Sequence, residues 1–127
     1  MPLLTRWFLL LGSLGLSLAV LLGAFGAHVL KNSLTPDLRA IYQTAVQYHF
    51  YHALGLLAVA LLSLHLPNSE LLKWSGWLLV GGILVFSGSL YMLSLSGARW
   101  LGALTPFGGT AFIVAWLLLF IAVLKTP

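Results

Sequence analysis

Residues 42–52, which read YQTAVQYHFYH, place a dense run of hydrogen-bonding side chains in an otherwise apolar chain. Histidine titrates near neutral pH and ligates metals, and buried ionisable groups in membranes are often functional. Three interpretations of His49 and His52 therefore stand side by side. They form hydrogen bonds that only support the fold at a membrane interface, they bind a metal with His28 as a third ligand, or they handle protons or a substrate in a pocket.

Other polar residues are expected at the same end of the molecule as this stretch. Helical geometry places Arg39, Gln43 and Gln47 on one flank of their helix, Tyr42 and His49 on another side, and Tyr48 and His52 between them. Because polar groups surround the helix, at least one flank should face other helices, another subunit or a water-filled pocket. We expect His28, His49 and Gln47 to share one polar cluster, joined by Thr105 or Tyr91. The candidate pocket comprises His28, Lys31, Arg39, Tyr42, Gln43, Gln47, Tyr48, His49, His52, Arg99 and Thr105.

No catalytic arrangement stands out, which favours a protein that is not an enzyme. Asp37 and Glu70 are the only acidic residues, and they are expected at opposite ends of the molecule, too far apart for a carboxylate pair. The absence of cysteine excludes disulfides, iron–sulfur clusters and thiolate metal sites. No cofactor is expected, and a metal enters only as the three-histidine alternative.

Composition places the chain in a membrane. The sequence is 61% hydrophobic and 6% charged, whereas an ordinary soluble domain has about 25% charged residues. The charged residues delimit four uncharged spans, 7–30, 40–69, 74–98 and 100–124, and each is long enough to cross a bilayer once. We predict one all-α domain over residues 1–127, a bundle of four transmembrane helices with short loops. The helices should cover about residues 4–30, 36–66, 71–95 and 101–125.

Local signals mark where some of these helices begin. Thr35 is a good N-cap and Pro36 suits the first helical position, so the second helix should start before its apolar core. Thr105 and Pro106 repeat this pair, and Pro106 either begins the fourth helix or kinks it.

Small residues line one side of the first predicted helix. Gly15, Ala19, Gly23 and Ala27 recur at every fourth position, which lets another helix approach closely in lipid. We expect this ridge to pack against protein, within the bundle or across a subunit boundary. Since four short helices offer little interior, we also expect a homo-oligomer.

The basic residues do not decide the orientation in the membrane. Four crossings put both termini on one side, with three basic residues there and three on the other side, so the positive-inside rule gives a tie. We expect cytoplasmic termini on general grounds only. The basic residues are scattered singly, which suits anchoring to lipid headgroups rather than binding of nucleic acid.

Three segments, GAFGAHVLK, YQTAVQYHFYHALGLLAVALL and LGALTPFGGTAFIVAWLLL, occur in an order that resembles a known family. The chain resembles, over almost its whole length, the membrane family catalogued as domain of unknown function 423, which includes relatives called transmembrane protein 256. The resemblance implies a small multi-pass protein, here of a bacterial inner membrane. It implies no activity and carries over no catalytic or binding residues.

Three functional hypotheses follow. The first is a membrane protein that binds a small hydrophobic or anionic ligand, such as a lipid or quinone, or passes a small solute through the polar pocket. It is favoured because Lys31, Arg39, Arg99 and two helix N-termini all attract anions. The second is a structural or accessory protein that acts by helix packing. The third is a metal or redox protein that uses His28, His49 and His52.

Overall fold

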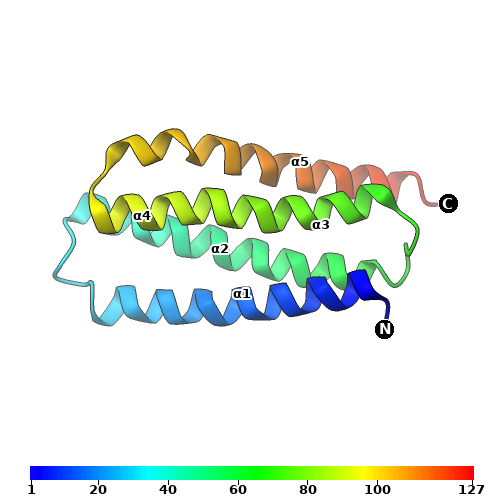
Figure 1. Ribbon diagram of the computed structural model, residues 1–127, viewed down its shortest axis with the longest axis horizontal. Coiled ribbons are helices and arrows are strands. Elements are labelled where there is room, and N and C mark those ends of the chain that lie inside the picture. The colour runs from blue at the N-terminus through cyan, green and yellow to red at the C-terminus, as the bar shows by residue number, and fades with distance from the viewer.

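The computed structural model describes residues 1–127 as four antiparallel helical rods joined by short connections (Figure 1). The first rod is α1 (Leu3–His28) and the second is α2 (Pro36–Leu62). Both chain termini lie at the same end of the bundle. All four rods are long and apolar enough to cross a membrane and the chain has no strand, which confirms the predicted all-α fold.

The third and fourth rods contain short segments of other helix types. The third consists of α3 (Glu70–Gly82), a π-helical segment (Ile83–Ser87) and α4 (Gly88–Ser96). The fourth opens with a 3₁₀ turn (Arg99–Ala103) and continues as α5 (Thr105–Leu124). A π turn adds one residue to the helix, so every residue after it is rotated by about 100° from its place in a continuous α-helix.

The helix ends follow from their capping residues. The Thr35 hydroxyl accepts a hydrogen bond from the backbone N–H of Leu38 at 3.2 Å, with Pro36 at the first helical position, as expected. Pro106 lies in the first turn of α5 and therefore begins that helix rather than kinking it. The second helix ends at Leu62, four residues before its predicted end at 66, because residues 64 and 65 bond to carbonyls three residues back.

The core lies where α2, α3 and α5 meet. It is built by Leu56 and Val59 of α2, Leu72 and Leu79 of α3, and Phe112 and Ala115 of α5, together with Phe8 of α1. Phe8 is the large anchor of α1 in this core, and its ring lies directly over Gly76, where a Cβ would overlap it. Elsewhere α1 packs on α2 and barely touches α3.

Small residues form the seam between α1 and α2. Gly15 lies against Ala53, Gly23 against Val46, and Ala19 is buried. Ala27 is exposed, because residues at a spacing of four drift by about 40° per step around a helix and leave the seam. Gly12 and Gly26, which lie beside the predicted ridge, make the closest approaches to α2.

Hydrogen bonds between rods tie the bundle together at several depths. The Ser75 hydroxyl of α3 donates to the Ala115 carbonyl of α5 at 2.8 Å, and Ser87 donates to Ala45 at 2.8 Å. The Ser89 and Thr105 hydroxyls lie 2.7 Å apart. Every buried side-chain nitrogen and oxygen has a partner, as a lipid environment demands.

Candidate functional site

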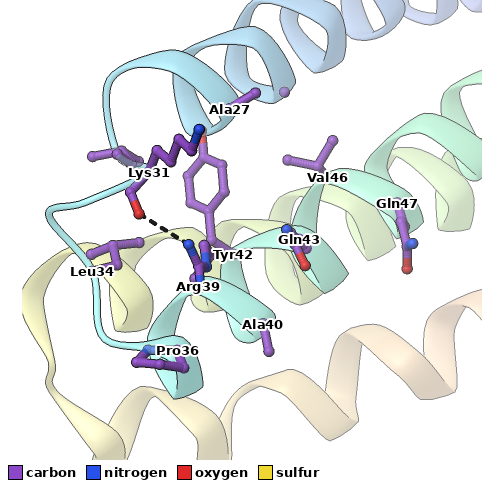
Figure 2. A pocket seen from close by; sticks show the side chains of 13 residues that line it. Ala27, Lys31, Leu34, Pro36, Arg39, Ala40, Tyr42, Gln43, Val46 and Gln47 are labelled. Atoms are coloured by element: carbon purple, nitrogen blue, oxygen red, sulfur yellow. Dashed lines mark hydrogen bonds between the residues drawn. The ribbon is translucent and has the colours of Figure 1, made fainter.

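A large pocket lies where α1 ends and α2 begins (Figure 2). Its volume is about 820 Å³, within the range of small-molecule sites. Figure 2 shows Lys31, Arg39 and Tyr42 gathered near the connecting loop, with Gln43 and Gln47 further along α2. The full lining is Gly23, Gly26, Ala27, Leu30, Lys31, Leu34, Pro36, Arg39, Ala40, Tyr42, Gln43, Val46 and Gln47.

The pocket exists because the two helices are joined by a loop that is longer than a tight turn. α1 ends at His28 and α2 begins at Pro36, so the connection leaves space beside the seam. Tyr42 closes the seam next to the pocket: its ring covers Gly26, and its buried hydroxyl donates to the Leu22 carbonyl of α1. Glycine at position 26 is what allows this ring to lie against the helix backbone.

The charges of the pocket are of one sign. Lys31 and Arg39 both line it, and the Arg39 guanidinium donates to the Lys31 carbonyl at 3.0 Å. The acid closest in sequence, Asp37, does not line the pocket and is ion-paired with Arg99 instead. The pocket therefore holds two cationic side chains and no carboxylate.

The pocket also offers neutral hydrogen-bonding groups. The amides of Gln43 and Gln47 are exposed in it and make no hydrogen bond within the protein. An amide can donate and accept at once, so each can turn toward a ligand or water. Leu30 and Leu34 supply apolar lining at the loop end of the pocket, and Val46 supplies it further along α2.

The three histidines expected at this end are placed apart. His28 is exposed and lies outside the pocket lining, whereas His49 is buried between α1 and α4, with Nδ1 2.9 Å from the Tyr91 hydroxyl. His52 stacks on Phe112 of α5 with ring centroids 3.5 Å apart. The chain contains no group of three or more His, Cys, Asp or Glu side chains that could hold a metal. The three-histidine site is therefore wrong.

The expected cluster of His28, His49 and Gln47 is also not formed. Gln47 lines the α1–α2 pocket, whereas His49 lies on the opposite flank of the seam between these helices. Its hydrogen-bond partner there is Tyr91, one of the two residues, with Thr105, that were expected to join the cluster. Of the other candidates, Tyr48 stacks over His52, and Thr105 bonds to Ser89. The single polar pocket expected from the sequence thus divides into separate environments.

Several lining residues escaped the sequence analysis. Gly26, Leu30 and Leu34 read as ordinary helix-end residues, and Val46 as ordinary membrane apolar surface. A signal was available only for Gly26, which stands beside the small-residue ridge and one helical turn from Leu22. The position of Tyr91 opposite His49 depends on the π-helical segment, which no sequence pattern predicts.

The chain matches a known protein family over a region that contains the pocket. The model of a family described as "Protein of unknown function (DUF423)" matches residues 22–109, which include the α1–α2 pocket. No solved structure matches the chain.

Relatives align over nearly the whole length. The UPF0382 membrane protein YwdK of Bacillus subtilis is 47% identical over 93% of this chain and 96% of its own. A UPF0382 membrane protein of Staphylococcus epidermidis is 49% identical over 93% of this chain and 95% of its own, and one of Staphylococcus aureus is 42% identical over 94% and 97%. With four helices able to span a bilayer and a family match over most of its length, this chain is a multi-pass membrane protein that belongs to the DUF423 family.

Proposed function

We propose that this protein binds the anionic headgroup of a membrane lipid in the pocket between α1 and α2. The observation that carries the proposal is the pair of cations, Lys31 and Arg39, in a pocket without a carboxylate. Two like charges held at one site favour an anion that bridges them. Arginine in particular matches the geometry of phosphate oxygens.

The position of the pocket fits a lipid better than a soluble anion. It lies where α1 ends and α2 begins, and the ends of helices that span a bilayer would lie near its headgroups. Val46, which lies further along α2 than Arg39 (Figure 2), gives the deeper part of the pocket an apolar surface against which the first part of an acyl chain would lie. Gln43 and Gln47 would then bond to the glycerol or ester oxygens below the phosphate.

The proposal includes a location and an assembly. We propose a bacterial inner membrane with cytoplasmic termini, and assembly of several copies into a homo-oligomer among membrane lipids. A mass measurement corrected for bound detergent would give the number of copies, and a monomer would contradict this part.

The competing candidate is an accessory protein that acts by helix packing alone. It is favoured by the full pairing of buried polar groups and by the close α1–α2 seam. That function needs no ligand in the pocket, so a binding experiment separates the two.

The test titrates lysophosphatidylglycerol into purified protein in neutral detergent and follows binding by calorimetry. The double variant Lys31→Gln/Arg39→Gln should lose at least about tenfold in affinity, because charge-assisted hydrogen bonds contribute about 1.5–3 kcal/mol each. The control is Arg6→Gln/Lys125→Gln, which also removes two positive charges, but from exposed positions outside the pocket.

Two further titrations identify the ligand class. Lysophosphatidylcholine has the phosphate but no net charge and should bind more weakly, whereas inorganic phosphate lacks the acyl chain and should bind weakly too. Equal affinity of the two double variants for lysophosphatidylglycerol would reject the proposal and favour the packing function. Tight binding of inorganic phosphate would show that the ligand is a free anion rather than a lipid.

A further inference from the structure

Aromatic side chains cover the side of the bundle where α2 and α5 lie next to each other. The backbones of these two helices scarcely approach, and aromatic rings fill the space between them. His52 of α2 stacks on Phe112 of α5 with ring centroids 3.5 Å apart, and the Trp116 ring lies 5.9 Å from that of His52. Tyr48 and Tyr51 extend this surface along α2, with ring centroids 6.1 Å apart. These five residues form what we call the aromatic face.

The aromatic face is open to the surroundings of the bundle and belongs to neither cavity. Tyr51 is 56% exposed and Trp116 is 39% exposed. None of the five residues lines the lipid pocket. None lines the apolar groove of about 260 Å³ on the other flank of α1, in which His49 and Tyr91 lie. The aromatic face is therefore a separate surface of the molecule.

Three polar atoms on this face have no partner within the chain. Nδ1 of His52 lies 2.7 Å from the Tyr48 carbonyl, which can only accept, so Nδ1 carries the hydrogen and Nε2 of the neutral ring is an acceptor. No group of the chain bonds to Nε2, and because every buried side-chain nitrogen has a partner, Nε2 reaches the surface. The hydroxyl of Tyr51 and the indole N–H of Trp116, both on exposed side chains, are donors without a partner in the chain.

These atoms lie at a depth where lipid cannot satisfy them. Tyr51 and His52 are near the middle of α2 (Pro36–Leu62), at least about 15 Å from either end of the helix. A bilayer has a hydrocarbon core about 30 Å thick, and a tyrosine side chain is too short to reach the headgroups from its centre. Polar groups without partners in hydrocarbon are costly. The aromatic face therefore calls for a partner that brings hydrogen-bonding groups into the core of the membrane.

A second copy of this chain supplies such groups at the right depth. Two copies inserted in the same orientation are related by a twofold axis along the membrane normal, so residues of equal depth meet. Tyr51 and His52 are neighbours in α2 and differ in depth by only about 1.5 Å. A donor and an acceptor at the same level make the face complementary to itself, since each copy offers what the other lacks.

We propose that the aromatic face pairs with the same face of a second copy, and that each Tyr51 hydroxyl donates to Nε2 of His52 in the other copy. Tyrosine and tryptophan are enriched at protein interfaces, which suits Tyr48 and Trp116 to pack around these two bonds. The inference rests on the homo-oligomer proposed above and gives it a contact surface. It is independent of the lipid pocket.

A crosslinking test locates the surface, because the chain contains no cysteine and each single variant carries one thiol. Leu54→Cys lies one helical turn from Tyr51 on the exposed side of α2 and keeps every polar group of the face. The matched control is Leu10→Cys on α1, since Leu54 and Leu10 are 47% and 50% exposed and lie at similar depths. Oxidation of membranes with copper phenanthroline should convert Leu54→Cys, and not Leu10→Cys, into a covalent dimer. No dimer from Leu54→Cys, or equal crosslinking of both variants, would overturn the proposal.

A second test removes the proposed hydrogen bond. Tyr51→Phe keeps the ring and should raise the dissociation constant of the dimer about eightfold, because two equivalent bonds are lost and each contributes about 0.6 kcal/mol on average. Sedimentation equilibrium in density-matched detergent measures this constant. The control is Ser13→Ala, which removes an exposed hydroxyl from α1 and should leave the constant unchanged. An equal dissociation constant in Tyr51→Phe and wild type would overturn the proposal.

The outcomes also separate this inference from the proposed function. A wild-type protein that is monomeric would reject the homo-oligomer and this surface together. A dimer that crosslinks through Leu10→Cys rather than Leu54→Cys would keep the homo-oligomer and reject the aromatic face alone. Tyr51→Phe should bind lysophosphatidylglycerol as wild type does, because Tyr51 does not line the lipid pocket.

Discussion

At the scale of single residues, His49 and His52 make different contacts although only three positions separate them along the helix. Residues three apart on a helix differ by about 60° in direction. In this bundle that angle is enough to aim His49 at Tyr91 of α4 and His52 at Phe112 of α5. The pair that looked like two ligands of one site therefore serves two different helix contacts, and only His49 lines a cavity.

Single hydroxyl groups also link the rods, and Ser75 offers the cleanest measurement. Its side chain is fully buried and donates to the Ala115 carbonyl at 2.8 Å. Hydrogen bonds between membrane helices contribute about 0.6 kcal/mol on average and up to about 1.7 kcal/mol. We expect Ser75→Ala to lower the free energy of unfolding by about that amount, measured by unfolding in increasing dodecyl sulfate.

The matched control for Ser75 is Ser13→Ala. Ser13 is exposed and bonds only to carbonyls of its own helix, at 2.6 Å to Leu9 and 3.2 Å to Leu10. Its removal should change stability by less than Ser75→Ala. Equal stability of Ser75→Ala and wild type would mean that the Ala115 carbonyl loses nothing when this donor is absent.

At the scale of helices, the α1–α2 seam shows which part of a small-residue pattern matters. A period of four predicts a straight ridge, but the seam follows the helix turn and uses Gly12, Gly15, Ala19, Gly23 and Gly26. Close approach is also unequal along it. A Cβ at Gly23 would make an ordinary 3.4 Å contact with Val46, whereas one at Gly26 would overlap the ring of Tyr42.

This inequality predicts different effects for one added methyl group. Gly26→Ala should displace the Tyr42 ring, break its bond to the Leu22 carbonyl and reduce the yield of folded protein. Overpacking of this kind costs about 1–3 kcal/mol. Gly23→Ala should behave like wild type, and comparison of the two by size-exclusion recovery after heating checks the order. A Gly23→Ala variant that is less stable than Gly26→Ala would show that the seam is arranged differently.

The element scale also marks where sequence reasoning stops. Apolar length and charge spacing predict the four rods, and capping chemistry at Thr35 predicts the start of α2. The π-helical segment at Ile83–Ser87 has no comparable signature, because its extra residue is stabilised by contacts with other rods, among them the bond from Ser87 to Ala45. The directions in which side chains after this turn point, and with them the His49–Tyr91 pair, therefore do not follow from the sequence.

At the scale of the whole molecule, the sequence locates the polar end but does not show how its residues divide into separate sites. Sequence places Lys31, Arg39, Tyr42, Gln43 and Gln47 at one end, and the structure collects these five around one pocket. The sequence does not reveal that His28 lies outside the pocket, or that Asp37 and Arg99 form an ion pair between the loops. Depth along a helix follows from residue number, whereas direction around the bundle depends on which rods are neighbours.

The topology itself yields a prediction about the two sides of the membrane. Four crossings place the α1–α2 loop on one side and the α2–α3 loop on the other side, with the termini. Asn32 and Asn68 are exposed in these two loops, and the chain contains no cysteine. Single variants Asn32→Cys and Asn68→Cys should therefore react with a membrane-impermeant maleimide from opposite sides, without any background labelling.

With the termini in the cytoplasm, Asn32→Cys should be labelled in intact cells and Asn68→Cys only after permeabilisation. Basic residues are balanced, with Lys31, Arg39 and Arg99 at one end and Arg6, Lys73 and Lys125 at the other, so they give no preference of their own. The reversed pattern would keep the four-span topology and invert the orientation, moving the lipid pocket to the inner leaflet. Labelling of both variants from the same side would contradict the topology, because it would require an even number of crossings between residues 32 and 68, where the structure has the single helix α2.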